Sequence, residues 1–383
     1  MKAGFVIFFS ILVIVYLLIN LYVFIRGAQA LTSFPRRLYI CLALMLSLSF
    51  LIGRFLEKYF PSIISEIFVW IGSFWIAIII YLFLFVLLID FLRMLNHFFS
   101  IFPAFIQKNY SKTKFILCVG ICSFVSLIVF WGFINSLFPQ TKFIELKISK
   151  RSIHRELKIL AISDIHLGTI IGKKRLTHLV NRINELKPDI VLFPGDIIDE
   201  DIGLIFKQNL HQIFKKIKSK YGIYACTGNH EYIGGIEKAM TFIKESGITI
   251  LRDSAIKIEE SIYIIGREDI NAKIFRGGKR KSLNEIVRGL DKKLPVIVMD
   301  HQPLHLQEAA DNNVDLQISG HTHHGQMFPG NIITGLIFEL SWGYIKKNNT
   351  HIYVTSGFGT WGPPVRLGNH PEIVLFKLII EKY

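Results

Sequence analysis

The chain has 383 residues, 51% of them hydrophobic, with a mean hydropathy of +0.42 and a formal net charge of +15. Residues 1–141 hold ten Lys and Arg but only three acids, whereas residues 142–383 hold the other 34 basic and 26 acidic residues. This distribution excludes an ordinary soluble protein. It predicts a membrane region over 1–141, followed by a domain of ordinary composition over 142–383.

Four apolar runs in the first region predict transmembrane helices over 4–25, 38–53, 67–89 and 115–138. Three of these runs lie within stretches of 22 or more residues without charge, and a helix of roughly 20 apolar residues crosses a hydrocarbon core. Leu38–Gly53 is the weakest, but snorkelling of Arg37 and Arg54 at its ends would extend it. The charge-free runs favour a plain anchor in the lipid bilayer.

The loops between the spans predict the topology. The loops after spans one and three contain seven Lys and Arg, the loop between them two, and the N-terminus only Lys2. The positive-inside rule places the richer loops in the cytoplasm. We therefore expect an integral protein of the plasma membrane whose second domain is extracytoplasmic. Ala28-Gln29-Ala30 resembles a signal-peptidase site, and cleavage there would leave three spans and a cytoplasmic domain. The preceding apolar run is longer than the roughly 7–15 residues of a signal peptide.

The second region alternates short apolar runs with charged stretches. The runs predict buried strands over 157–162, 190–193, 222–225, 296–299 and 316–318. Helical spacing predicts helices over 173–186 and 204–218. Alternation of strands and helices is typical of an α/β fold. Cys226 is alone in this region, which excludes an internal disulfide and a thiolate zinc cluster.

Each predicted strand runs into a short polar segment, namely Ser163–His166, Gly195–Asp199, Gly228–Glu231, His301–Pro303 and Gly320–His323. Sites in open α/β sheets gather at the carboxyl ends of strands. Carboxylate, imidazole and amide ligands without thiolate favour divalent ions such as Mn, Fe or Zn. The D-x-H and H-x-H spacings would place both side chains on one side of an extended segment. A carboxylate shared by two ions would hold them roughly 3.5–4 Å apart, as in phosphoester hydrolysis.

Taken together, these segments resemble the calcineurin-like metallophosphoesterase superfamily. The pattern D-x-H, G-D-x-x-D, G-N-H-[DE], an isolated His after an apolar strand, and G-H-x-H is present in this order over residues 157–323. Tyr353–Phe376 resembles the closing region of a membrane-anchored bacterial-type branch with N-terminal transmembrane helices. The resemblance implies a two-sheet β-sandwich flanked by helices, with a centre of two divalent metal ions.

The resemblance also implies roles for individual residues. One metal would be bound by Asp164, His166, Asp196 and His323. The other would be bound by Asn229, His301, His321 and again Asp196, which would bridge the two. His230 would contact the phosphate or protonate the leaving oxygen. The family reaction is in-line attack on phosphorus by a metal-bound hydroxide.

The neighbouring polar residues have other expected roles. Asp199 and Glu231 are expected to orient ligands or cap helices rather than bind metal. Strand alternation points Asp300 away from the centre. His324 breaks the H-x-H alternation and is expected to point away as well. Arg366 is the candidate for substrate binding, with a structural surface role as the alternative.

The expected function is that of a membrane-anchored phosphoesterase acting on a phosphate ester or pyrophosphate. The spans and the basic segment Lys273–Lys281 favour an amphiphilic, phosphorylated substrate at the bilayer, such as a UDP-acyl-sugar. The alternative is a non-catalytic membrane scaffold or sensor with a metal-binding domain, but the complete ligand set argues against it. Nucleic acid is not expected as a partner, since one short basic segment makes no broad basic face.

Overall fold

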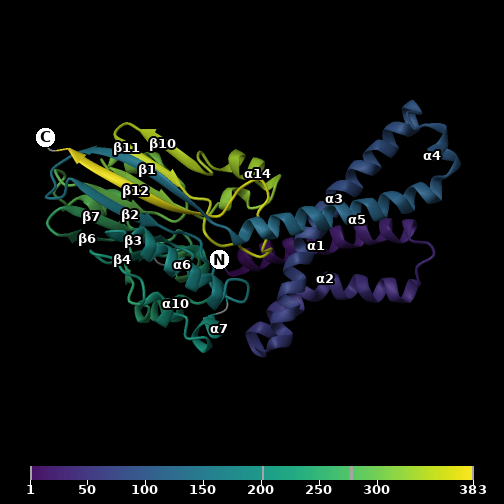
Figure 1. The fold of residues 1–383 in the computed structure, drawn as a ribbon, viewed down its shortest axis with the longest axis horizontal. Helices are drawn as coiled ribbons and strands as arrows, with labels where there is room; N and C mark the ends of the chain where they lie inside the picture. The colour runs from purple at the N-terminus through teal and green to yellow at the C-terminus, as the bar shows by residue number, and fades with distance from the viewer. Residues whose placement is uncertain (1, 201, 277–278, 382–383) are drawn as a thin grey trace. The chain divides into compact units, whose positions relative to one another are not determined.

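The computed structural model describes residues 2–200, 202–276 and 279–381. The chain divides into two compact units (Figure 1). The first comprises Met1–Ile134 and Gly362–Val365, and the second comprises Asn135–Trp361 and Arg366–Tyr383.

The first unit is built from apolar helices. They are α1 (Lys2–Ala30), α2 (Arg36–Tyr59), α3 (Ile63–Phe99), α4 (Ala104–Lys108) and α5 (Tyr110–Leu137). All except α4 are long and apolar enough to cross a membrane, as the sequence predicts. At 1.5 Å per residue, the 37 residues of α3 extend over about 55 Å. This exceeds the roughly 30 Å of a hydrocarbon core, so α3 is long enough to reach past it.

Small and polar residues join the first three helices. A Cβ on Gly72 of α3 would collide with the backbone of Phe50 in α2, so the two helices approach as closely as glycine allows. Asn20 of α1 accepts hydrogen bonds from Trp75 Nε1 at 2.8 Å and from Ser47 Oγ at 3.0 Å. Because hydrocarbon offers no other partners to these groups, the bonds tie α1, α2 and α3 together.

The second unit contains two six-stranded sheets. The first sheet has the order β1 (Gln140–Ser149), β12 (Glu372–Glu381), β2 (Glu156–Ala161), β3 (Ile190–Pro194), β4 (Ile223–Cys226) and β5 (Thr249–Ile250). The second has the order β10 (Gly343–Lys347), β11 (Thr350–Val354), β9 (Leu316–Ser319), β8 (Val296–Met299), β7 (Ile262–Gly266) and β6 (Ser254–Ile258). Strands β2 to β5 are parallel to one another, and so are β7, β8, β9 and β11.

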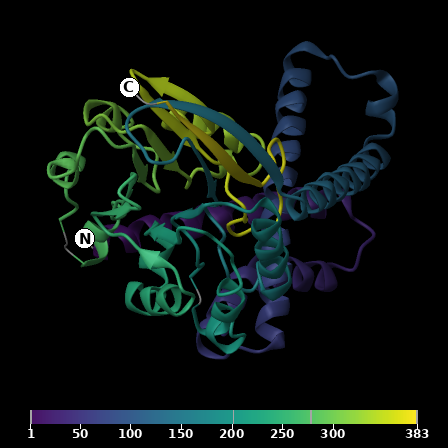
Figure 2. The same cartoon turned by 60° about the vertical axis from the view of Figure 1, so that its left-hand side comes forward.

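The inner faces of the two sheets share one apolar core, to which Ile159 and Phe376 contribute from the first sheet and Ile264 and Ile318 from the second. The outer face of the first sheet packs against α6 (Lys173–Leu186), α7 (Ile202–Lys207), α8 (His211–Phe214) and α10 (Ile236–Glu245). Figure 1 labels α6 and α10 below the yellow strand β12, and Figure 2 shows the teal helices of this unit again below the yellow strand.

The outer face of the second sheet packs against α12 (Leu283–Val287) and α13 (Gln307–Asp311). The layers therefore follow the order helix, sheet, sheet, helix, which confirms the predicted fold class. The remaining short elements are α9 (Asn229–Ile233), α11 (Ala272–Arg276), the 3₁₀ turn η1 (His323–Gly325) and α14 (Gly330–Ile337).

The predicted strands agree with the structure to within one residue at each end, and helix 173–186 has the predicted bounds. The single helix predicted over 204–218 is wrong. The chain forms α7 and α8 instead, because Asn209 between them adopts a left-handed conformation with φ of 51°. Asparagine tolerates this conformation, and it ends a right-handed helix.

Candidate metal centre

Five strands deliver polar side chains to one end of the sandwich. In the first sheet β2, β3 and β4 are parallel neighbours, and in the second sheet β8 and β9 are. The carboxyl ends of parallel neighbours meet at one edge of a sheet. The two edges also meet each other, since His301 Nε2, after β8, lies 3.1 Å from Asp196 Oδ2, after β3. The site is therefore built between the two sheets.

One group of buried ligand atoms consists of Asp164, His166 and His323. The Nε2 atoms of His166 and His323 are 3.0 Å apart. Asp164 Oδ1 lies 3.5 Å from His323 Nε2 and 4.0 Å from His166 Nε2. His166, the histidine of the D-x-H motif, thus faces His323, the second histidine of the H-x-H motif, across the site.

Another group consists of Asp196, His301 and His321. The side-chain oxygen of Asn229 lies 3.2 Å from His301 Nε2 and 2.9 Å from His321 Nδ1. Asp196 Oδ2 is also 3.9 Å from His166 Nε2. Asp196 therefore stands between the two groups, where the resemblance expects a bridging ligand.

The backbone conformation of the two motif segments differs from the prediction. Asp164 and His166 have φ of 56° and 51°, and His321 and His323 have φ of 71° and 47°. The extended segments expected from the D-x-H and H-x-H spacings are therefore wrong, because the chain turns through left-handed residues at both places. A Cβ on Gly320 would collide with the Asp164 side chain, so glycine is needed for this close approach.

The electrostatics of the site suit a cation. Burial lowers the pKa of His166 and of His321 to about 3, so both rings are neutral near pH 7 and offer a nitrogen lone pair. Burial alone would raise the pKa of Asp196, but His301 and His230 hold it well below its ordinary value. Within each group the ligand atoms lie within 4.8 Å of one another. The two neutral imidazoles, the ionised carboxylate of Asp196 and the amide oxygen of Asn229 are donors that fit divalent ions.

Glu231 fixes the loop that carries Asp196. Its carboxylate accepts hydrogen bonds from the backbone N–H groups of Asp196, Ile197 and Ile198, at 3.0, 2.8 and 3.1 Å, and from that of Gly228 at 2.7 Å. The side chain is fully buried, and these bonds replace its contact with water. This is the orienting role that the sequence predicts for Glu231.

His230 and Asp199 form a pair beside the first group. Asp199 Oδ1 lies 3.2 Å from His230 Nδ1 and 4.0 Å from His166 Nδ1, so one carboxylate faces both rings. A carboxylate behind a histidine fixes the ring orientation and leaves the opposite nitrogen for chemistry. Burial alone would lower the pKa of His230, but Asp196 and Asp199 outweigh it and raise the pKa to about 9. The ring of His230 is therefore a proton donor near neutral pH.

Arg366 does not lie where the sequence prediction placed it. The side chain is fully buried and donates to the carbonyl oxygens of His323, at 2.9 Å, and Gly359, at 2.5 Å. A second guanidinium nitrogen lies 3.0 Å from His323 Nδ1. Burial lowers its pKa to about 9, which leaves it cationic near pH 7. A side chain without exposed surface cannot contact a substrate, so Arg366 is a positioning residue for His323.

The segment Lys273–Lys281 also contributes less free charge than the sequence suggests. The guanidinium of Arg280 pairs with the buried carboxylate of Asp300, which also lies 3.3 Å from Arg267. Asp300 points away from the metal ligands, as predicted. Gly277 and Gly278 of this segment lie outside the described residues.

Aromatic residues that the sequence reading did not assign to the site lie beside it. The ring of Trp361 is 5.9 Å from that of His230, and the ring of Phe338 is 6.0 Å from that of His321. Trp361 is half exposed. Trp361 lies in the Gly-rich segment before Arg366, and this position in the sequence could have indicated that it lies at the rim of the site.

His323 and His324 provide a matched pair for testing the metal ligands. His324 Nδ1 lies 3.2 Å from Ser341 Oγ, and its ring lies 5.1 Å from that of Trp342, outside both ligand groups. His323→Ala is expected to lower the bound metal measured by elemental mass spectrometry, because it removes a nitrogen that faces His166. His324→Ala is expected to leave the metal content unchanged. Equal losses in the two variants would contradict this assignment.

Several known proteins are similar in sequence to this chain. Residues 157–325 match the family model of the calcineurin-like phosphoesterases. A metallophosphoesterase of Helicobacter pylori is 31% identical over 275 residues, which cover 71% of this chain and 71% of that protein. A transmembrane protein with a metallophosphoesterase domain from Danio rerio is 28% identical over 365 residues, which cover 91% and 82%. The chain therefore belongs to the calcineurin-like metallophosphoesterases, and it is a metal-dependent phosphoesterase with N-terminal apolar helices.

Proposed function

We propose that the second unit binds two divalent ions of the Mn, Fe or Zn type and hydrolyses a phosphate ester or pyrophosphate. The observation that carries this proposal is the position of Asp196 between two groups of buried or half-buried candidate ligands. Asp164, His166 and His323 would hold one ion, and Asn229, His301 and His321 the other, with Asp196 shared. The ions would activate water and offset negative charge on the phosphoryl oxygens.

The chain's own residues supply orientation and a proton. His230 is held by Asp199 through Nδ1, and its backbone N–H donates to Asp196 Oδ1 at 2.9 Å. Its ring is thereby fixed relative to the shared carboxylate. Protonated His230 would donate its proton to the oxygen of the leaving group, and such proton transfer contributes roughly 10²–10⁴-fold to a rate. Glu231 and Arg366 keep Asp196 and His323 in place behind the site.

Removal of the ions or of the shared carboxylate tests the catalytic proposal. Chelation is expected to abolish hydrolysis of a generic phosphodiester, and Asp196→Asn is expected to do the same because one ligand to both ions loses its charge. Asp311→Asn, an exposed surface change in the same unit, is the matched control. Wild-type rates for Asp196→Asn would disprove the catalytic assignment and favour a non-catalytic scaffold.

An exposed apolar helix beside the site supports an amphiphilic substrate. Helix α14 has no buried residue, and Ile332, Ile333, Leu336 and Ile337 are each more than half exposed. Phe338, directly after α14, contacts the ring of His321. An apolar surface of this kind usually marks a binding site. We infer that the phosphate lies at the metal centre and an acyl chain lies on α14, as a UDP-acyl-sugar or a related lipid-linked substrate would allow.

This placement predicts a change in substrate preference. Leu336→Ser, at a side chain that is 83% exposed, is expected to lower kcat/KM for a long-chain phosphate ester by roughly tenfold. It should leave kcat/KM for a short, water-soluble ester unchanged. Ile153→Ser, a similarly exposed position elsewhere in the second unit, is the control. A loss of the same size with both esters would rule out chain binding at α14.

We propose further that the protein is anchored in the plasma membrane with the second unit outside. The support is the excess of Lys and Arg between the first and second and between the third and fourth charge-free spans. A reporter that works only outside the cytoplasm is expected to be active when it is fused after Tyr383. Activity of a reporter that works only in the cytoplasm would reverse the proposed orientation.

A further inference from the structure

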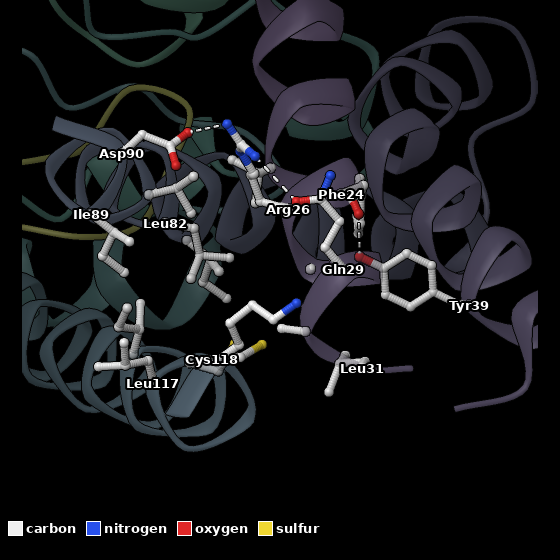
Figure 3. A pocket seen from close by; sticks show the side chains of 18 of the residues that line it. Phe24, Arg26, Gln29, Leu31, Tyr39, Leu82, Ile89, Asp90, Leu117 and Cys118 are labelled. Atoms are coloured by element: carbon white, nitrogen blue, oxygen red, sulfur yellow. Dashed lines mark hydrogen bonds and ion pairs between the residues drawn. The ribbon is translucent and has the colours of Figure 1, made fainter. Parts of the chain in front are cut away.

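The helices of the first unit border a half-open cavity of about 380 Å³. Its lining comes from α1, α3 and α5, with Tyr39 of α2 at one side. The deeper lining is apolar and includes Trp75, Leu82, Val86 and Ile121. This volume lies within the range of about 300–1,000 Å³ that is common for ligand sites. Figure 3 shows Leu82, Ile89 and Leu117 on one side of the space and Tyr39 and Leu31 on the other.

The lining also carries charge, namely the three cations Arg26, Arg93 and Lys114 and a single carboxylate, Asp90. Asp90 pairs with Arg26 at 2.6 Å and with Arg93 at 3.0 Å (Figure 3 shows the first pair). It also accepts a hydrogen bond from the Tyr22 hydroxyl at 2.5 Å. The sequence has no other acid in residues 1–56 or 67–141. The lining therefore carries more positive than negative charge.

These charges lie at the level where lipid phosphates are found. The charge-free stretch of α1 ends at Arg26, that of α3 ends at Asp90, and that of α5 begins directly after Lys114. Since charge-free stretches occupy the hydrocarbon core, the three residues mark one boundary of that core. Cations at this boundary attract anionic headgroups.

We propose that this cavity binds a phospholipid with an anionic headgroup. One acyl chain occupies the apolar interior beside Trp75 and Leu82, and the phosphate lies against Arg26, Arg93 and Lys114. Asp90 holds the two arginines in place and leaves the rim with a net positive charge. The site is separate from the metal centre, and its existence does not depend on the proposed reaction.

Binding of short-chain lipids to the full-length chain in detergent tests the proposal, with native mass spectrometry as the readout. Dioctanoyl phosphatidylglycerol is expected to bind with one molecule per chain, at least tenfold more tightly than dioctanoyl phosphatidylcholine. Lys114→Gln is expected to weaken this binding about fivefold, because one cation near the headgroup is lost. Arg36→Gln removes a cation from the same end of the helices that does not line the cavity, and it is expected to have no effect.

Two further measurements distinguish lipid binding in the cavity from two alternatives, which are binding of the headgroup alone and adsorption of lipid on the outer helix surface. Glycerol phosphate, which has the phosphate but no chain, is expected not to bind at the concentrations used for the lipid. Ile121→Trp fills the cavity and is expected to abolish lipid binding without changing the helical circular dichroism. The proposal would be overturned if the two lipids bound equally tightly, or if glycerol phosphate bound as tightly as the lipid. It would also be overturned if Lys114→Gln and Arg36→Gln had equal effects, or if Ile121→Trp bound lipid fully.

Discussion

The buried carboxylate of Asp196 is the constraint on which the second unit depends. A charge taken out of water costs several kcal/mol unless opposite charge and hydrogen bonds surround it. Here His301 lies 3.1 Å away, and the His230 backbone N–H donates to the same carboxylate. Glu231, itself buried, accepts hydrogen bonds from the backbone N–H groups of Asp196 and Ile197 and from that of Gly228, and so ties the Asp196 loop to its own turn. The site is therefore a polar network with matched partners inside an apolar sandwich.

The sandwich makes this network possible because both sheets end at the same place. The core between the sheets holds their edges together, and the parallel strands on either side direct their loops into one space. Left-handed residues and close-packed glycines then turn the chain so that ring nitrogens face one another. Such conformations cost free energy, and they persist where the surrounding structure holds them in place. Rigid strands below the loops supply that support.

The first unit follows a different rule, because hydrocarbon cannot satisfy polar groups. Asn20, Ser47 and Trp75 satisfy one another across three helices, and Asp90 is matched by Arg26 and Arg93. The apolar helices therefore also carry specific polar contacts that join them to one another. The same charges that set the end of the hydrocarbon layer also give the cavity its positive character, so anchoring and lipid binding would share one set of residues.

The sequence by itself determined the four apolar helices, the strands that lead to the site and the candidate ligand residues that follow them. These are local signals, since hydrophobic runs and short motifs lie in consecutive residues. Only the tertiary structure decided that Arg366 is buried behind His323, that Asp199 faces both His166 and His230, and that α14 is left exposed beside the metal centre. Each of these features depends on contacts between residues far apart in the chain, or on a surface that no neighbour covers. Burial and long-range contact arise from packing, and no local pattern specifies them.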